Sequence, residues 1–335
     1  MQTNNDSTKI IQKKKWLRTD KNVVNSDMPK KKNAFIKEMK QNYVLYLMTV
    51  PGIFLLIMFA YVPMAGIYMA FTDFNVVDGI FGSPFVGLDN FKYFFAKNSM
   101  GWKVIYNTLY INFFSIILGL IVPISIAIFF NEIRSKLFKR FTQSMMFFPY
   151  FLSWVVVGAV IYGFFSSDVG MVNQFLESIG REPISWYSEP KYWKGILIFT
   201  NVWKYSGYSS IIYMAAMANF DGSLFEAAKV DGANKLQRIF YLILPLLKPT
   251  VVILTLLNIG RIFYGDMGMI YGIIGNNPML VSEVSVIDTY VYQSMRTLGF
   301  SYSTAIGLFQ SVMGLILVTA ANKYAKKIND GEGLF

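Results

Sequence analysis

The sequence predicts an all-α integral membrane protein with six transmembrane helices. Three observations lead to this fold class: 54% of the 335 residues are hydrophobic, only 15% are charged, and the mean hydropathy is +0.41. Soluble globular chains carry about 25% charged residues. The apolar residues also gather in blocks of about 20 residues, the length at which a helix crosses the hydrocarbon core of a bilayer.

Six such blocks follow one another in the predicted transmembrane domain, residues 43–322. The expected spans are 43–71, 107–130, 144–165, 195–218, 246–273 and 302–321. Pro51 and Pro63 fall inside the first block, where a spanning helix tolerates proline if neighbouring groups satisfy the freed carbonyls. A polar segment, residues 219–245, separates the fourth span from the fifth.

The distribution of Lys and Arg predicts the orientation. Eleven of the 31 cations precede Tyr43, in a polar stretch (1–42) without the h-region of a secretory signal. We predict a basic cytoplasmic arm there, either partly disordered or lying on the membrane surface as a helix. Together with the 133–140 loop, residues 219–248 and the tail 323–335, this side carries 22 cations against 7 on the other. Both termini and segment 219–245 are therefore predicted to be cytoplasmic.

Two absences limit the chemistry of the chain. Neither Cys nor His occurs, which excludes disulfides, thiol catalysis and Cys or His metal sites. The Gly-Lys dipeptide that ends the phosphate-binding loop of an ATPase is also missing. We therefore predict no catalytic residue, no metal site and no bound cofactor.

The polar segment contains a distinctive spacing. It reads EAAKVDGANKLQRIFYLILPLLKP from Glu226 onward. Glycine tolerates backbone conformations that a side chain forbids, so we expect two short helices hinged at Gly232. Ala227 and Ala228 leave a smooth face for another protein, and the prolines after Leu244 suit the first turn of the next helix. The bland alternative is a polar loop whose acidic residues are simply solvated.

This segment resembles the EAA loop of permease subunits in bacterial ATP-binding-cassette importers, in the binding-protein-dependent sugar and oligosaccharide family. Further stretches similar to that family are VGLDNF from Val86, NTLYINFF from Asn107, WKYSGYSSIIYMAAM from Trp203, GRIFYGDMGMIYG from Gly260, VIDTYVY from Val286 and residues 305–335. The resemblance covers nearly the whole chain after Tyr43. It implies a type I importer permease fold with a cytoplasmic coupling helix.

The resemblance also implies partners and a role for the segment. The partners are a second, related permease, two ATPase subunits that use ATP and Mg, and an extracellular solute-binding protein tethered by lipid, in the plasma membrane of a Gram-positive bacterium. The residues implied in coupling to the ATPase are Glu226, Ala227, Ala228, Asp231, Gly232, Leu244 and Pro245. Leu242 replaces the isoleucine of the common motif, a small change.

Polar residues inside spans are candidates for the substrate pathway because polarity there is costly. The candidates are Lys204, Tyr205, Asn258, Arg261, Tyr264, Asp266 and Gln310. The alternatives are an interhelical ion pair and, for Lys204, snorkelling toward the interface. Arg261 and Lys204 would suit an acidic saccharide, whereas a neutral one needs only aromatic rings and amides; both remain open.

Two other functional classes compete with the importer. A gradient-driven secondary transporter would place coupling carboxylates at mid-membrane, and only Asp266 qualifies. An intramembrane enzyme would need paired acids or a metal cluster, and no close acid pair stands out.

Overall fold

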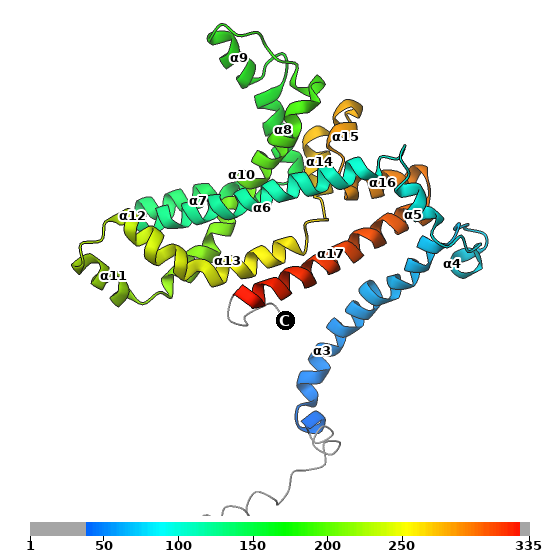
Figure 1. The fold of residues 1–335 in the computed structure, drawn as a ribbon, viewed down its shortest axis with the longest axis horizontal. Coiled ribbons are helices and arrows are strands. Elements are labelled where there is room, and N and C mark those ends of the chain that lie inside the picture. The colour runs from blue at the N-terminus through cyan, green and yellow to red at the C-terminus, as the bar shows by residue number, and fades with distance from the viewer. Residues whose placement is uncertain (1–37, 329–335) are drawn as a thin grey trace, which may run out of the picture. The chain divides into compact units, whose positions relative to one another are not determined.

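A computed structural model describes residues 38–328. These residues form helices joined by loops, with one isolated β-bridge between Thr72 and Phe85. The chain divides into two compact units, Met1–Ala65 and Gly66–Phe335, and each is described by itself (Figure 1). The predicted arm (1–42) and tail (323–335) lie largely outside the described residues, so those two predictions stay open.

Four helical segments in the described part of the chain are long and apolar enough to cross a membrane. They are Tyr43–Phe71, Gly101–Glu132, Lys235–Ile259 and Phe300–Lys327. A fifth crossing results if the bent pair Lys136–Phe151 and Trp154–Phe165 is one span. The remaining predicted span, 195–218, is the 26-residue helix α10 (Trp193–Ala218), which is long enough but less apolar. The assignment of 195–218 as a membrane span therefore rests on the length of α10 and not on its hydropathy.

The first span contains two irregular stretches. Helix α3 (Tyr43–Leu56) is followed by a π-helical turn (Ile57–Tyr61) and a 3₁₀ helix (Val62–Phe71). The π turn precedes Pro63, whose ring clashes with the carbonyl four residues earlier and whose nitrogen has no hydrogen to donate. A wider turn there removes the clash without ending the span.

The second unit is built around two long helices. Helix α6 (Gly101–Glu132) packs along α10 over a core that includes Ile111 and Leu197. Helix α7 (Lys136–Phe151) also lies against α10. A Cβ on Gly207 would be only 1.9 Å from the Met146 carbonyl oxygen, so glycine permits this approach of the two backbones.

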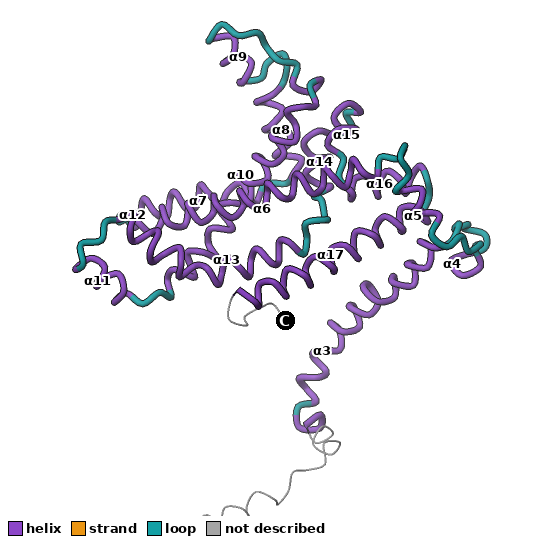
Figure 2. Tube along the Cα trace, viewed as in Figure 1, coloured by secondary structure: helices purple, strands orange, loops and turns teal. Residues whose placement is uncertain are grey.

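Two of the predicted spans are broken, which the sequence did not indicate. The third consists of α7 and α8 (Trp154–Phe165), whose axes differ by 103°. The fifth consists of α13 (Leu244–Ile259) and α14 (Met267–Ile274), separated by a loop (Figure 2). The spans predicted over 144–165 and 246–273 each contain a break that was not predicted. Hydropathy averages over a window and does not detect a short bend.

The two segments that follow the breaks pack against each other. Helices α8 and α14 meet at Gly158 and Gly272, where a Cβ on Gly158 would be 1.8 Å from the Gly272 carbonyl oxygen. The last span is α17 (Phe300–Ile328), which lies along α13 and along the amphipathic helix α16 (Ile287–Thr297). The breaks therefore lie inside a packed helical unit.

Candidate functional site

The segment predicted to couple to the ATPase, residues 219–245 and named the coupling segment from here on, contains helix α11 (Gly222–Val230), which carries Glu226, Ala227 and Ala228. Asp221 caps this helix by accepting a hydrogen bond from the Ser223 backbone N–H at 2.9 Å. That hydrogen bond lowers the pKa of the Asp221 carboxyl, so the cap is ionised at neutral pH. Glu226 and Ala227 are exposed and Ala228 is half-buried. The EAA face is therefore open to a partner.

The predicted hinge is present at Gly232, which has a φ of +76°. Asp231 ends α11, and Asn234 begins the next helix through a capping box with Gln237, with N···O distances of 2.7 and 2.9 Å. A residue with a Cβ is disfavoured at this positive φ. The glycine thus sets the angle between α11 and the helix after it.

The sequence had suggested that the second short helix is separate from the fifth span. In the structure the two are continuous. Helix α12 (Lys235–Arg238), a π turn (Ile239–Ile243) and α13 form one continuous stretch of 25 residues, Lys235–Ile259. Leu244 and Pro245 lie at the start of α13 within this stretch. The π turn accommodates Pro245, which has no N–H for the carbonyl four residues earlier. This stretch therefore connects α12 directly to the break after Ile259.

The coupling segment lies at the end of the second unit where α6 meets α7 (Figure 1). Lys235 forms an ion pair with Glu132, the last residue of α6, at 3.2 Å. Large apolar side chains nearby are exposed, among them Val230, Leu236 and Tyr241. Exposed apolar residues close to a polar, hinged helix indicate a surface for protein contact.

Lys204 binds the backbone at the first break, which lies between α7 and α8. Its side chain is 4% exposed, and Nζ donates to the carbonyls of Pro149, Tyr150 and Leu152 at 3.2, 2.8 and 2.6 Å. Helix α7 ends at this point, so its last carbonyls lack the next turn of the helix as a partner; the Pro149 carbonyl also accepts a hydrogen bond from the Leu152 N–H at 3.2 Å. An ammonium has three donors, and all three are used. Snorkelling is excluded by this burial, and a direct contact of Lys204 with substrate would require it to leave the break.

Trp154 joins the first break to the second. Its indole Nε1 donates to Asp266 Oδ2 at 2.8 Å, and Asp266 Oδ1 accepts from the Met269 backbone N–H at 2.8 Å, which caps α14. The ammonium of Lys204 lies 5.2 Å from the centre of the Trp154 ring, within cation–π range. Tyr205 packs edge-on against the same indole at 6.0 Å. Lys204, Tyr205 and Asp266 are therefore brought together by a residue that was not predicted.

Side chains from α6, α16 and α17 bind the backbone of the second break, which lies between α13 and α14. Asn112 of α6 donates to the carbonyls of Ile262 and Tyr264 at 2.7 and 2.9 Å. Gln310 of α17 donates to the Phe263 carbonyl at 2.8 Å and to Asp288 Oδ2 at 2.9 Å. Non-helical backbone at membrane depth needs such internal partners. Gln310 is buried and has a structural role here.

Asn258, Arg261 and Tyr264 form an exposed polar strip beside this break. The Arg261 N–H donates to the Asn258 carbonyl at 3.0 Å, and the Tyr264 N–H to the Arg261 carbonyl at 2.8 Å. This spacing of three places the side chains on one face, and all three are exposed. Within residues 38–328, no ion pair joins Arg261 to an acidic residue.

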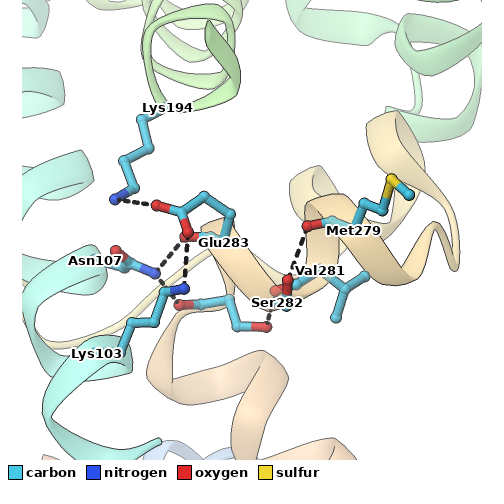
Figure 3. A network of polar contacts seen from close by, with 8 residues as sticks. Lys103, Asn107, Lys194, Met279, Val281, Ser282 and Glu283 are labelled. Carbon is cyan, nitrogen blue, oxygen red and sulfur yellow. Dashed lines mark hydrogen bonds and ion pairs between the residues drawn. The ribbon is translucent and has the colours of Figure 1, made fainter. Parts of the chain in front are cut away.

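A second polar cluster lies at the N-terminal ends of α6 and α10 (Figure 3). Glu283 of helix α15 (Pro278–Val284) pairs with Lys103 at 2.7 Å and with Lys194 at 3.1 Å. Asn107 donates to the carbonyls of Glu283 and Ser285 at 2.7 and 3.0 Å. The hydrogen bond from Lys103 lowers the pKa of the Glu283 carboxyl. This cluster fixes α15 to α6 and α10.

Residues 115–329 match the protein family described as binding-protein-dependent transport system inner membrane component. The chain belongs to this family. It is a multi-pass permease of the plasma membrane, in an importer system that depends on a binding protein. Its role is transport, as in the related permeases, and not catalysis.

Two relatives of the permease come from Bacillus subtilis (strain 168). Protein LplB is 34% identical over 92% of this chain and 99% of its own length. The polygalacturonan/rhamnogalacturonan transport system permease protein YteP is 37% identical over 91% of this chain and 94% of its own length. The similarity therefore extends over nearly the entire length of both proteins.

Solved structures resemble the permease in fold as well as in sequence. A chain in the crystal structure of a bacterial ABC transporter that imports the acidic polysaccharide alginate has a TM-score of 0.80 and 32% identity, over 88% of this chain and 99% of that chain. A second has a TM-score of 0.79 in a complex with an alginate pentasaccharide-bound periplasmic protein. The type I importer permease fold expected from the sequence is confirmed.

Sequence reasoning missed Trp154, Asn112 and Asp288. Asn112 and Asp288 lie in stretches that resemble the family, and each is a polar residue among apolar ones, which is the only signal that could have suggested them. Their targets are backbone groups about 150 and 23 residues away in the chain, at Ile262 and Gly265. No local pattern identifies such targets.

Proposed function

We propose that this chain is one of two permease subunits of an ATP-driven importer that takes up an acidic oligosaccharide. The saccharide is delivered by a lipid-anchored extracellular solute-binding protein. Two partner ATPase subunits, which use ATP and Mg, supply the energy. Family membership and the coupling segment support this arrangement, and neither supports the gradient-driven alternative.

The coupling residues are proposed to act as a hinged contact. Glu226 and the two alanines would present the exposed face of α11 to the ATPase, and Asp231 and Gly232 would set its angle. Leu244 and Pro245 lie in the continuous helix that leads from this hinge to the break after Ile259. Closure of the ATPase dimer would therefore act on the polar strip through one helical rod.

The exposed guanidinium of Arg261 is the main observation in favour of an acidic substrate. Ile259 lies eleven residues beyond Lys248, the last cation before the break, or about 17 Å along a helix. If Lys248 lies at the cytoplasmic boundary of the membrane, the strip would lie near the middle of a hydrocarbon core of about 30 Å. A charged group there requires a partner or a water-filled path. A uronic acid carboxylate offers a bidentate partner, while Asn258 and Tyr264 can bind hydroxyls.

The descriptions of two similar proteins support an acidic saccharide as the substrate. One similar structure is described as importing alginate, and YteP as serving polygalacturonan and rhamnogalacturonan transport. Lys204 no longer contributes to this proposal as a direct ligand, because its donors are engaged by carbonyls. Its role would be to keep the first break in shape.

The orientation proposed for the chain has structural support. The 133–140 loop and the coupling segment, which both carry excess cations, lie at the same end of the second unit. The positive-inside rule makes this end cytoplasmic. With an even number of spans, both termini would face the cytoplasm. The host membrane would be the plasma membrane of a Gram-positive bacterium, as the resemblance implies.

The test is ATP hydrolysis by the assembled importer. The chain is co-expressed with the proteins encoded beside it, and hydrolysis is measured with the binding protein and with oligogalacturonate, oligoalginate or a neutral oligosaccharide. We expect stimulation by an acidic oligosaccharide, loss of it in Glu226→Lys and Gly232→Asp, and preserved assembly in Arg261→Gln with weaker acidic stimulation. The control is Gly222→Ala in α11, the helix that carries Glu226, because no atom lies within 4 Å of the added Cβ.

The outcomes separate the two parts of the proposal. If no ATPase copurifies and the coupling variants change nothing, the importer mechanism is wrong. If a neutral oligosaccharide stimulates and Arg261→Gln has no effect, only the acidic substrate is wrong.

A further inference from the structure

A basic pocket lies between the coupling segment and the end of α6. Its volume is about 330 Å³, and its lining includes Arg134, Lys229, Lys235 and Arg238, with one acidic residue, Glu132. Lys235 pairs with that acid at 3.2 Å. Within the described residues, no ion pair engages the other three cations. The pocket therefore carries unbalanced positive charge.

Arg238 has a buried donor without a partner. Its Nε is shielded from solvent and forms no hydrogen bond with any residue that the structure describes. Leaving a buried donor of a charged group unsatisfied is costly. Phe225 and Ile243 also line the pocket and contribute apolar surface to it. Because Arg238 also lines the pocket, the rest of its guanidinium can bind an anion there.

The pocket also lies where an apolar span ends. Asn131 and Glu132 are the last residues of α6, and both line it. Next along the chain, the first turns of α7 alternate cations such as Lys139 with exposed apolar residues such as Leu137. This pattern is typical of the boundary between hydrocarbon and headgroups. Basic pockets between helices on the cytoplasmic side bind anionic lipid headgroups.

We propose that this pocket binds a phosphate group, either from an anionic phospholipid of the adjacent leaflet or from a small cytosolic phosphate compound. Guanidinium groups bind phosphate oxygens through paired, charge-assisted hydrogen bonds, and Lys229 adds a point charge from α11. The ligand contacts α11, α12 and the α6–α7 loop at once. It therefore braces the coupling helix against the transmembrane helices, independently of which saccharide is carried.

The test uses the complete importer in detergent. Native mass spectrometry and thermal unfolding are recorded with dioctanoyl phosphatidylglycerol, dioctanoyl phosphatidylcholine and glycerol 3-phosphate. We expect one phosphatidylglycerol adduct per copy of this chain and a rise in Tm. Arg238→Gln should weaken binding about tenfold, whereas Arg238→Lys, which keeps the charge, should retain part of it.

The matched control is Lys139→Gln, which removes one charge at the same end of the molecule but outside the pocket. Equal losses in Arg238→Gln and Lys139→Gln would mean unspecific attraction to anions and would overturn the proposal. Binding of glycerol 3-phosphate identifies a soluble ligand, and binding of phosphatidylglycerol alone identifies the lipid. If neither binds, or if Arg238→Gln only releases the ATPase, the pocket is not a phosphate site.

Discussion

The indole N–H of Trp154 donates a hydrogen bond to the carboxylate of Asp266 at 2.8 Å, across 112 positions of sequence. Trp154 begins the helix after the first break, and Asp266 caps the helix after the second. One contact thus couples both interruptions of the transmembrane helices. The second break lies beside the polar strip proposed to meet the substrate, so the contact links that strip to the first break.

The coupling between the two breaks can be measured with a double-mutant cycle. Trp154→Phe removes the donor, Asp266→Asn weakens the acceptor, and the pair is then combined. Because the residues are in direct contact, the two losses should not add, with a coupling free energy of unfolding of about 1 kcal/mol. Thermal and denaturant unfolding of the importer in detergent give the values. Strictly additive losses would mean that the contact does not join the breaks.

Lys204 is expected to be a structural residue. Lys204→Met keeps the length of the side chain but removes the ammonium donor from three carbonyls at the end of α7, of which the Pro149 carbonyl keeps the Leu152 N–H as a partner. We expect a loss of about 2 kcal/mol in the free energy of unfolding. Lys248→Met, at an exposed position of α13, is the control and should change little. An unfolding midpoint equal to that of wild type in Lys204→Met would contradict this role.

The contact between α8 and α14 should be intolerant of any side chain. Gly158→Val would force atoms into the Gly272 backbone, because even a Cβ would lie 1.8 Å from its carbonyl oxygen. We expect loss of the folded permease, seen as aggregation in size-exclusion chromatography. Gly163→Val, in the same helix with nothing within 4 Å of the added Cβ, should remain monodisperse. Comparable behaviour of the two variants would argue against the close approach.

The ion pairs of Glu283 should make the position of α15 depend on pH. The hydrogen bond from Lys103 lowers the pKa of this carboxyl in the folded protein. Its stabilising contribution is therefore complete above the ordinary pKa of glutamate, about 4.3, and is lost as the pH falls through the lowered pKa. The Tm difference between wild type and Glu283→Gln should be present at pH 7 and shrink in acid. A difference that is constant with pH would show that the charge has no role.

Much of the fold could be predicted because it depends on composition along the chain. Apolar length located the spans, the excess of cations separated the two sides, and the EAA spacing placed the hinge at Gly232. These features are local, and each has a direct physical cause in hydration, membrane charge or backbone freedom. The spans with well-marked ends, such as Tyr43–Phe71, agree closely with the structure.

The candidate site depended on contacts that composition does not contain. Lys204, Arg261, Asp266 and Gln310 all looked alike as polar residues in apolar helices, yet only Arg261 among them is exposed. The others satisfy backbone groups at two breaks that hydropathy did not detect.

The order of residues was enough to predict that this chain crosses a membrane several times, which end carries the cations, and where the chain turns at Gly232. These properties follow from residues close together in the chain. The three-dimensional packing was needed to show which polar residues hold the fold and which remain exposed. The reason is that an unpaired carbonyl in a membrane must find a donor wherever the packing supplies one, here on a helix about 50 to 150 residues away.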